Sequence, residues 1–311
     1  MRRNRRRRPN RGGGLYADIF GEEGSEVVVH GDGTTTVRAT NAVLGFLNRT
    51  GYTGYKYVLD GGLLNNADDG IVTELRLTAD SYMQVTKNQA STYAWIGRSG
   101  DRGAAYADLG GHELSLTAAS GKHFGLMNAT FENGSVYMRS GGWFSTTNSV
   151  VATNNVKLTV GCASDMAGSV AVADYIVLQG NKDYNSGAGV IDVYGTFSMN
   201  SRIYHGTMLH DGSTIDFTRY GADIPFPLPT VAMFAASATG DKTLRFEPGA
   251  TIGVKLGDRK VKSGACIISW DSETAPDASV KFIRADADKR HKLVKKSDGL
   301  YLYRGFSVIV R

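Results

Sequence analysis

The stretch that decides the fold is FENGSVYMRSGGWF, residues 131–144, which joins a turn-forming phrase to a short strand. An acid and an Asn-Gly pair precede an alternating apolar run in which Val136 and Met138 share one face. HDGSTI (210–215) and FEPGATI (246–252) repeat the same order of acid, glycine, small residue and β-branched residue. Glycine supplies a corner with positive φ, and an acid or Asn satisfies the N–H groups of a turn. We therefore expect one corner to be built three times, each time leading into a strand with one buried face.

Short alternating strands of this kind recur along the chain, whereas helical periodicity is almost absent. Their central apolar residues follow one another at intervals of about 20, the length of one coil of a β-solenoid. The series is Leu77, Trp95, Leu114, Val136, Leu158, Val177, Phe197 and Phe217. The same spacing suits a β-sandwich. The solenoid is favoured because such short strands gain pairing partners above and below, and because few hairpin dipeptides join strands of matched length.

The charge is distributed unevenly. The net charge is +5, but residues 1–11 hold seven arginines, between Arg2 and Arg11, and no acid. Residues 12–252 carry 15 basic and 23 acidic side chains, and residues 253–311 carry 13 and 7. The folded body is therefore acidic. No basic stripe with interleaved aromatic residues follows the arginines, so we expect a solvated tail, and nucleic-acid binding only through that tail.

Composition also predicts the domain organisation. Residues 1–14 read as a basic, disordered tail, residues 15–252 as the β-helix, and residues 253–311 as a C-terminal β cap, because glycine falls from 34 in the first 252 residues to 5 in the last 59. Strands are expected in GVKLGDRKVKSGACIISW, SVKFIRA and GLYLYRGFSVIVR. Before the cap, IPFPLP (224–229) places prolines at alternate positions. Because proline has no backbone N–H, one edge of an extended segment there would lack hydrogen-bond donors.

Two further expectations concern export and thiols. The basic start is followed by glycines and acids rather than the apolar run of a signal peptide, and no apolar run is long enough to span a bilayer. The sequence as it stands thus shows no leader, and it is treated as a possible fragment. Cys162 and Cys266 are expected to be free, buried thiols, since two cysteines support no disulfide framework.

One longer phrase carries a resemblance to a known group. YADLGGHELSLTAASG (106–121) is similar to the "DL-x-G-H-x-L-x-L" coil phrase of autotransporter-like β-solenoid proteins of bacterial surfaces. FENGSV, FEPGATI and the ending from KLGDR to DGLYLYRG resemble the same group, so the likeness covers about residues 55–311. It implies an all-β, right-handed parallel β-helix with a C-terminal strand cap. It also implies an exported, non-catalytic protein, although the visible sequence leaves the export route open.

Aromatic residues supply the best candidate for a binding site. Tyr52, Tyr55 and Tyr57 in GYTGYKY, together with Trp143 and Trp95, could form a platform that stacks on sugar rings. Packing in the core or between coils is the alternative. A platform requires exposed rings.

A carbohydrate-active enzyme of the polygalacturonase or lyase type is the alternative function. Its candidate residues are Asp68, Asp69 and His112, but Glu113 stands where the polygalacturonase phrase has a second glycine, and Asp residues in turns commonly cap backbone groups. His205 and His210 are not accompanied by a metal-binding pattern. We expect no metal and no cofactor.

The sequence therefore predicts a non-catalytic, surface-associated or secreted β-solenoid, a structural or adhesive module. Its expected partner is a polysaccharide or a host or cell-surface protein, and its expected location is extracellular or at the bacterial cell surface.

Overall fold

The computed structural model describes the backbone of residues 17–21, 25–29, 35–40, 43–48, 55–67, 71–72, 74–85, 93–97, 104–120, 122–138, 143–160, 163–166, 169–178, 190–199, 206–218, 226–230, 243–257, 260–286 and 291–304. All regular structure in these residues is β-strand. The chain divides into two compact units, Met1–Val156 and Lys157–Arg311. The arginine tail, Tyr52, Asp68, Asp69 and Cys162 lie outside the described residues.

The described residues of the first unit form thirteen strands and most of a fourteenth. They are β1 (Ala17–Gly21), β2 (Ser25–Val29), β3 (Thr35–Thr40), β4 (Val43–Asn48), β5 (Tyr55–Asp60), β6 (Leu63–Ala67), β7 (Ile71–Val72), β8 (Glu74–Leu77), β9 (Ser81–Val85), β10 (Tyr93–Ile96), β11 (Ala105–Asp108), β12 (Glu113–Ala118), β13 (His123–Met138) and β14 (Trp143–Val160).

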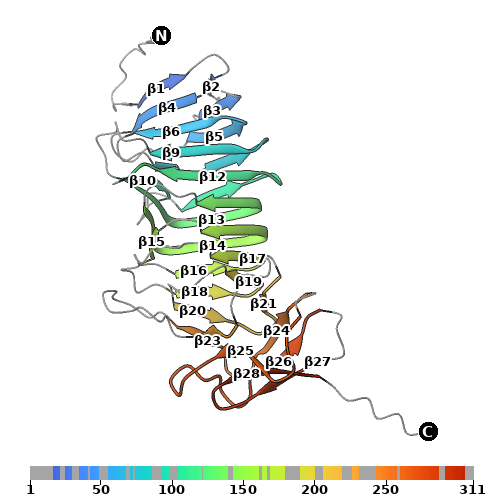
Figure 1. The fold of residues 1–311 in the computed structure, drawn as a ribbon. Coiled ribbons are helices and arrows are strands. Elements are labelled where there is room, and N and C mark those ends of the chain that lie inside the picture. The colour runs from blue at the N-terminus through green and yellow to red at the C-terminus, as the bar shows by residue number, and fades with distance from the viewer. Residues whose placement is uncertain are drawn as a thin grey trace, which may run out of the picture. The chain divides into compact units, whose positions relative to one another are not determined.

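Parallel ladders define the coils of this unit. One ladder runs β4, β6, β9, β12 and β13 (Figure 1). A second runs β3, β5, β8, β11 and β13, and a third runs β7, β10 and β13. Strand β13 belongs to all three, because its residues 123–126, 129–132 and 135–138 pair with β10, β11 and β12 in turn. This strand is one complete coil of a three-sided parallel β-helix, and it includes the FENGSVYM phrase.

Asparagine, more than glycine, makes the bends of this coil. Asn128 has φ 49° and Asn133 has φ 56°, so both occupy the left-handed region between successive sides. The expectation that Gly134 supplies the positive φ was wrong. A Cβ on Gly134 would lie 2.4 Å from the His112 carbonyl oxygen and 2.5 Å from Leu109 Cβ, so glycine is needed there for close approach of two coils. In the other two corner phrases, Gly212 and Gly249 do have positive φ, as predicted.

The first two strands depart from parallel stacking. Strand β1 pairs with β4 in antiparallel fashion, and β2 pairs with β3 in the same way. The parallel coils therefore begin at β3 and β4.

The second unit contains the end of β14 and the following strands: β15 (Ala163–Met166), β16 (Ser169–Val172), β17 (Tyr175–Leu178), β18 (Val190–Val193), β19 (Thr196–Met199), β20 (Gly206–Leu209), β21 (Thr214–Asp216), β22 (Leu228–Pro229), β23 (Leu244–Phe246), β24 (Thr251–Lys255), β25 (Ala265–Ser269), β26 (Lys281–Arg284), β27 (His291–Lys295) and β28 (Gly299–Arg304).

Two parallel ladders stack here as well. Strands β16, β18, β20 and β23 form one, and β17, β19, β21, β24 and β26 form the other (Figure 1). The predicted parallel β-helix is confirmed by these ladders and by those of the first unit. The segment SVKFIRA, expected in the cap, instead forms β26 and continues the parallel ladder on β24.

A separate sheet forms the C-terminal cap. Its order is β22-β25-β28-β27, and we call these four strands the cap sheet. Strand β22 contains Pro229 and lies at the sheet edge, as its prolines predicted. Three rings join the cap sheet to the parallel strands: Trp270 stacks on Phe282 with centroids 5.9 Å apart, and Phe246 meets both edge-on. The aromatic contacts thus seal the cap against β23 and β26.

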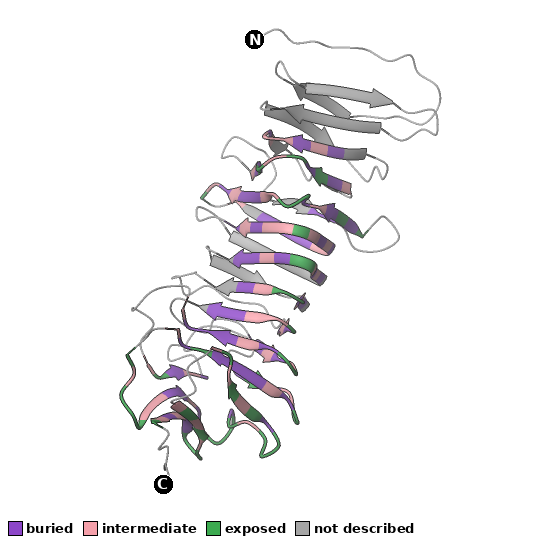
Figure 2. Cartoon of the chain, turned by 90° about the vertical axis from the view of Figure 1, so that its right-hand side faces the viewer, coloured by how far each residue is buried: buried purple, intermediate pink, exposed green. Residues whose placement is uncertain are grey.

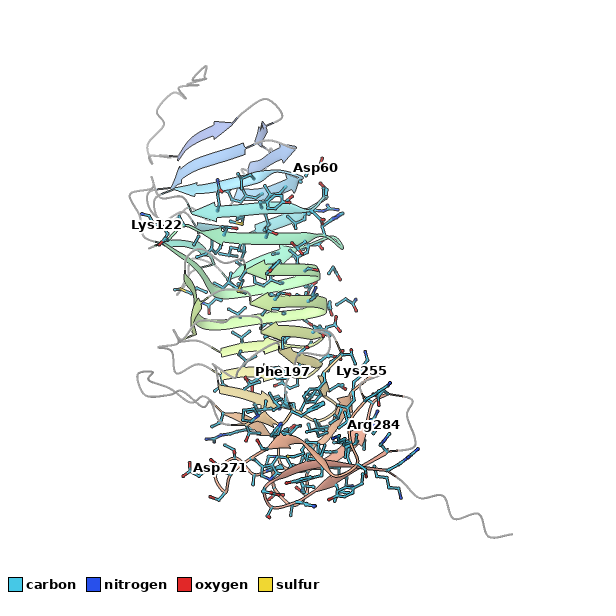
Figure 3. All side chains as sticks on the ribbon, in the orientation of Figure 1. Asp60, Lys122, Phe197, Lys255, Asp271 and Arg284 are labelled. Atoms are coloured by element: carbon cyan, nitrogen blue, oxygen red, sulfur yellow. The ribbon has the colours of Figure 1, made fainter. Side chains whose placement is uncertain are left out.

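Buried residues alternate with partly or fully exposed ones along β8, β11 and β18, whereas β12 and β24 each bury three residues in a row. Figure 2 colours the chain by burial. Leu114 pairs with Val136, as the 20-residue series predicted, and both are fully buried. The next ladder runs Leu158, Ile176, Phe197 and Ile215, so Val177 and Phe217 were each assigned to the wrong register. Phe197 is labelled in Figure 3.

Coil length varies more than the series assumed. Trp95 pairs with Ile71 and Gly125 on a different side from Leu77. Leu114 pairs with Ser81, a step of 33 residues, whereas Thr35 pairs with Tyr55, a step of 20. A fixed period fails because residues can be added between strands without changing which strands stack.

Candidate functional site

The predicted aromatic platform is not supported at the residue that can be examined. Tyr57 is only 3 % exposed and lies between Val37 and Leu75 in the ladder. Alternation along β5 turns Tyr57 and Leu59 to the same buried face. Tyr55 and Trp143 lie in β5 and β14, but their side chains, like that of Trp95, are outside the described residues.

The alternative enzyme site can be examined at His112. Its Nδ1 atom lies 3.7 Å from Asp80 Oδ1, and the same carboxylate oxygen accepts a hydrogen bond from the Glu113 backbone N–H. Asp80 thus links the turn before β9 to the turn before β12 in the next coil. Its contacts are those of a residue that joins coils.

A different cluster stands out in the second unit, at the corner that follows β16, β18, β20 and β23. Register places Val172, Val193, Leu209 and Phe246 opposite one another in successive coils. The residues one position further on are Ala173, Tyr194, His210 and Glu247, and we call these four the corner column. Backbone bonds confirm the alignment: Tyr194 N–H donates to Val172 O, His210 N–H to Val193 O, and Glu247 N–H to Leu209 O.

The corner column is tightly arranged around His210. Its Nε2 atom lies 2.9 Å from Asp192 Oδ1, and its Nδ1 atom lies 3.3 Å from Glu247 Oε2. The Tyr194 ring stacks on the imidazole with centroids 4.2 Å apart and planes inclined by 9°. The imidazole side chain is 17 % exposed, whereas Tyr194 is 51 % exposed.

Gly195, which directly follows Tyr194, has no room for a side chain. A Cβ on Gly195 would lie 2.0 Å from the Asp174 carbonyl oxygen and 2.5 Å from that of Ala173. Asp211, next to His210, accepts a hydrogen bond from the Thr251 N–H of the following coil and donates its own N–H to Glu247 Oε2. The acid of the HDG phrase therefore connects coils, whereas the sequence predicted that it would satisfy its own turn.

These contacts limit the chemistry that the cluster can perform. Both imidazole nitrogens already face carboxylate oxygens, so neither is free to exchange a proton with a substrate while the contacts persist. The two carboxylates flank an imidazole rather than an open space, whereas a glycosidase needs a sugar between its acids. What the cluster does offer to solvent is the Tyr194 ring.

A second polar cluster lies on the cap sheet. Tyr301 donates a hydrogen bond to Asp298 Oδ2 at 2.8 Å, which raises the pKa of the phenol to about 12. Lys296 Nζ donates to Tyr303 Oη at 2.7 Å and sits over the Tyr301 and Tyr303 rings. Beside them Cys266 is a free thiol, half-buried rather than buried as predicted, and burial raises its pKa. A thiol with a raised pKa is a poor nucleophile, so this cluster is read as structural.

Across the described residues, no group of three or more His, Cys, Asp or Glu side chains is arranged to hold a metal ion. In the same residues no helix is long and apolar enough to cross a membrane.

Sequence reasoning named His210 but examined it only for metal binding, and it treated HDGSTI and FEPGATI as separate corners. Aligning those two phrases coil on coil would have placed His210 beside Glu247. A search for a period of 20 does not find this alignment, because His210 and Glu247 are 37 residues apart. Tyr194 carries no local signal.

Comparisons of the chain with protein-family models, with curated proteins and with solved structures gave no significant match. The autotransporter-like resemblance therefore rests on the phrases quoted above.

Proposed function

We propose that the protein is a non-catalytic, surface-associated or secreted β-solenoid that acts as a structural or adhesive module. The observation that carries this proposal is the use of polar groups at the corners. Asp80, Asp211 and His210 each bond to a neighbouring coil, so charged side chains that could have formed a reactive centre instead hold the stack together.

Exposed aromatic residues support the adhesive part of the proposal. Tyr82 and Tyr106 in the first unit and Tyr194 in the second are large side chains with 44–51 % of their surface exposed. Tyrosine is favoured at binding surfaces because it combines a broad apolar face with a polar tip. The partner is a polysaccharide or a cell-surface protein, met outside the cell.

The test is to incubate the full chain with bacterial cells and with purified cell-surface polysaccharides, and to measure both retention and cleavage. We expect saturable binding to cells or polysaccharide without new reducing ends. New reducing ends that disappear in an active-site variant would overturn the non-catalytic assignment. Absence of binding to every surface would overturn the adhesive one.

A carbohydrate-active β-helix enzyme is the second candidate. Asp192, His210 and Glu247 bring titratable groups from three coils together, but their mutual contacts would have to open before they could act on a sugar. That function predicts that His210→Ala abolishes polysaccharide cleavage. The site first predicted from the sequence is tested separately by Asp68→Asn and Asp69→Asn, which should abolish cleavage if those residues are catalytic.

A further inference from the structure

We propose that the exposed face of Tyr194 binds one ring of a neutral or amino saccharide, at the level of Ala173 in the corner column. This inference rests on the proposed function, since it names the ligand class and the position for an adhesive surface of the second unit.

The first step concerns the direction of the Tyr194 ring. Successive strands of a parallel ladder lie about 4.8 Å apart, and the Tyr194 and His210 rings are separated by 4.2 Å with nearly parallel planes. The two rings therefore stack along the ladder, each at the level of its own coil. One face of Tyr194 meets His210, and the opposite face is directed toward the preceding coil.

The second step concerns what occupies that preceding level. The residue in register there is Ala173, which is exposed and ends in a methyl group. A methyl group cannot cover an aromatic face, which is consistent with the 51 % exposure of Tyr194. The stack of rings in the corner column therefore ends at Tyr194, whose second face has no ring partner from that column.

The third step is the rigidity of the platform. Carboxylates on both sides hold His210, the largely buried imidazole supports Tyr194, and Gly195 allows the backbone to pack directly on residues 173 and 174. A ring held in place before binding loses little conformational freedom on binding.

The fourth step identifies the ligand. The open face of an aromatic ring suits the C–H face of a pyranose. The charged group beside this level is Asp174, which is exposed and directly follows Ala173, whereas the Asp192 and Glu247 carboxylates contact His210 on the other side of the Tyr194 ring. Carboxylates accept hydrogen bonds from sugar hydroxyls and attract ammonium groups, but they repel uronic acids. Neutral and amino sugars fit this setting, whereas acidic sugars do not.

The experiment measures binding of a cello-oligosaccharide, a chitosan oligosaccharide and an oligogalacturonate to the full chain by titration calorimetry. We expect the first or second to bind and the third to bind more weakly. Tyr194→Ala should weaken binding about tenfold or more through loss of the stacking face.

Ala173→Phe is the sharper variant, because it places a protein ring where we place the sugar. It should abolish binding while leaving thermal stability unchanged or raised. Tyr194→Phe keeps the ring and should bind like the wild type. The matched control is Ile283→Ala, which removes a large apolar side chain of similar exposure (52 %) from β26 and should also bind like the wild type.

The remaining outcomes each overturn a definite statement. Wild-type affinity in both Tyr194→Ala and Ala173→Phe would remove this site but leave the proposed function standing. Preferential binding of oligogalacturonate would overturn the ligand class. No binding of any saccharide by a chain that still binds cells would overturn the inference alone, and loss of cell binding as well would overturn the proposed function.

Discussion

Two corners, one in each unit, place a histidine beside glycines and acids but give it different surroundings. His112, in GGHE, lies 3.7 Å from a single carboxylate, and 36 % of its side chain is exposed. His210, in HDGS, is flanked by carboxylates at 2.9 and 3.3 Å and supports a tyrosine ring. Local sequence is similar at both corners. The difference comes from what neighbouring coils place at the same position, so the properties of a solenoid surface belong to columns of residues rather than to single coils.

Both corners should depend first on the leucine beneath them, and this is the largest effect we expect. Leu109 and Leu209 are fully buried next to the two turns. Replacing either by alanine should lower the free energy of unfolding by about 2–5 kcal/mol, through lost burial and the cavity left behind. Urea unfolding measures the loss. Leu→Met at the same positions keeps the side-chain volume and should cost less than about 1.5 kcal/mol. If Leu→Ala and Leu→Met lowered stability equally, the loss would not come from the cavity.

The histidines themselves should separate the two corners. His210→Ala removes two contacts with carboxylates and one ring stack, and should cost about 1–2 kcal/mol. His112→Ala loses one long, exposed contact and should change stability by less than about 0.5 kcal/mol. The same unfolding experiment measures both. If the two variants lowered the free energy of unfolding equally, the different contacts of the two histidines would not contribute differently to stability.

The smallest effect is a pH dependence that distinguishes the cap sheet. Because Asp298 accepts a hydrogen bond from the Tyr301 phenol, the folded-state pKa of Tyr301 is raised to about 12. A raised pKa means that this stabilisation is fully present below the ordinary tyrosine pKa of about 10. It is lost as pH rises through the folded value.

Ultraviolet titration of tyrosinate should therefore show a late-ionising tyrosine that disappears in Tyr301→Phe. In the first unit Tyr106 donates a hydrogen bond to Glu132, which also raises its pKa, and Tyr106→Phe is the matched comparison. If the signal lost in Tyr301→Phe belonged instead to a tyrosine that ionises near its ordinary pKa of about 10, the Asp298 contact would not persist in solution.

The sequence predicted what a single coil contains. The alternation of Val136 and Met138, the corners at Gly212 and Gly249, and the edge position of Pro229 follow from local rules of backbone and burial, and all are found. Register was predicted less well. The 20-residue series used Val177, whereas its neighbour Ile176 is the residue that pairs with Phe197, and a shift of one residue reverses the face.

The candidate site was missed for a related reason. Tyr194, His210 and Glu247 are brought together by steps of 16 and 37 residues, which no periodic pattern reveals. Tyr57 was a candidate for an exposed platform, with packing in the core as the alternative, and the inward alternation of β5 places it in the core. Ladder pairing, which joins residues far apart in sequence, determines both outcomes.

The unequal steps between paired strands bear on how such a chain can change over generations. Leu209 follows Val193 after 16 residues and Phe246 follows Leu209 after 37, yet all three remain opposite one another. Insertions and deletions between strands therefore need not disturb the column beside them. A lineage can lengthen or shorten the connecting segments, and with them the outline offered to a partner, while inheriting the corner column intact.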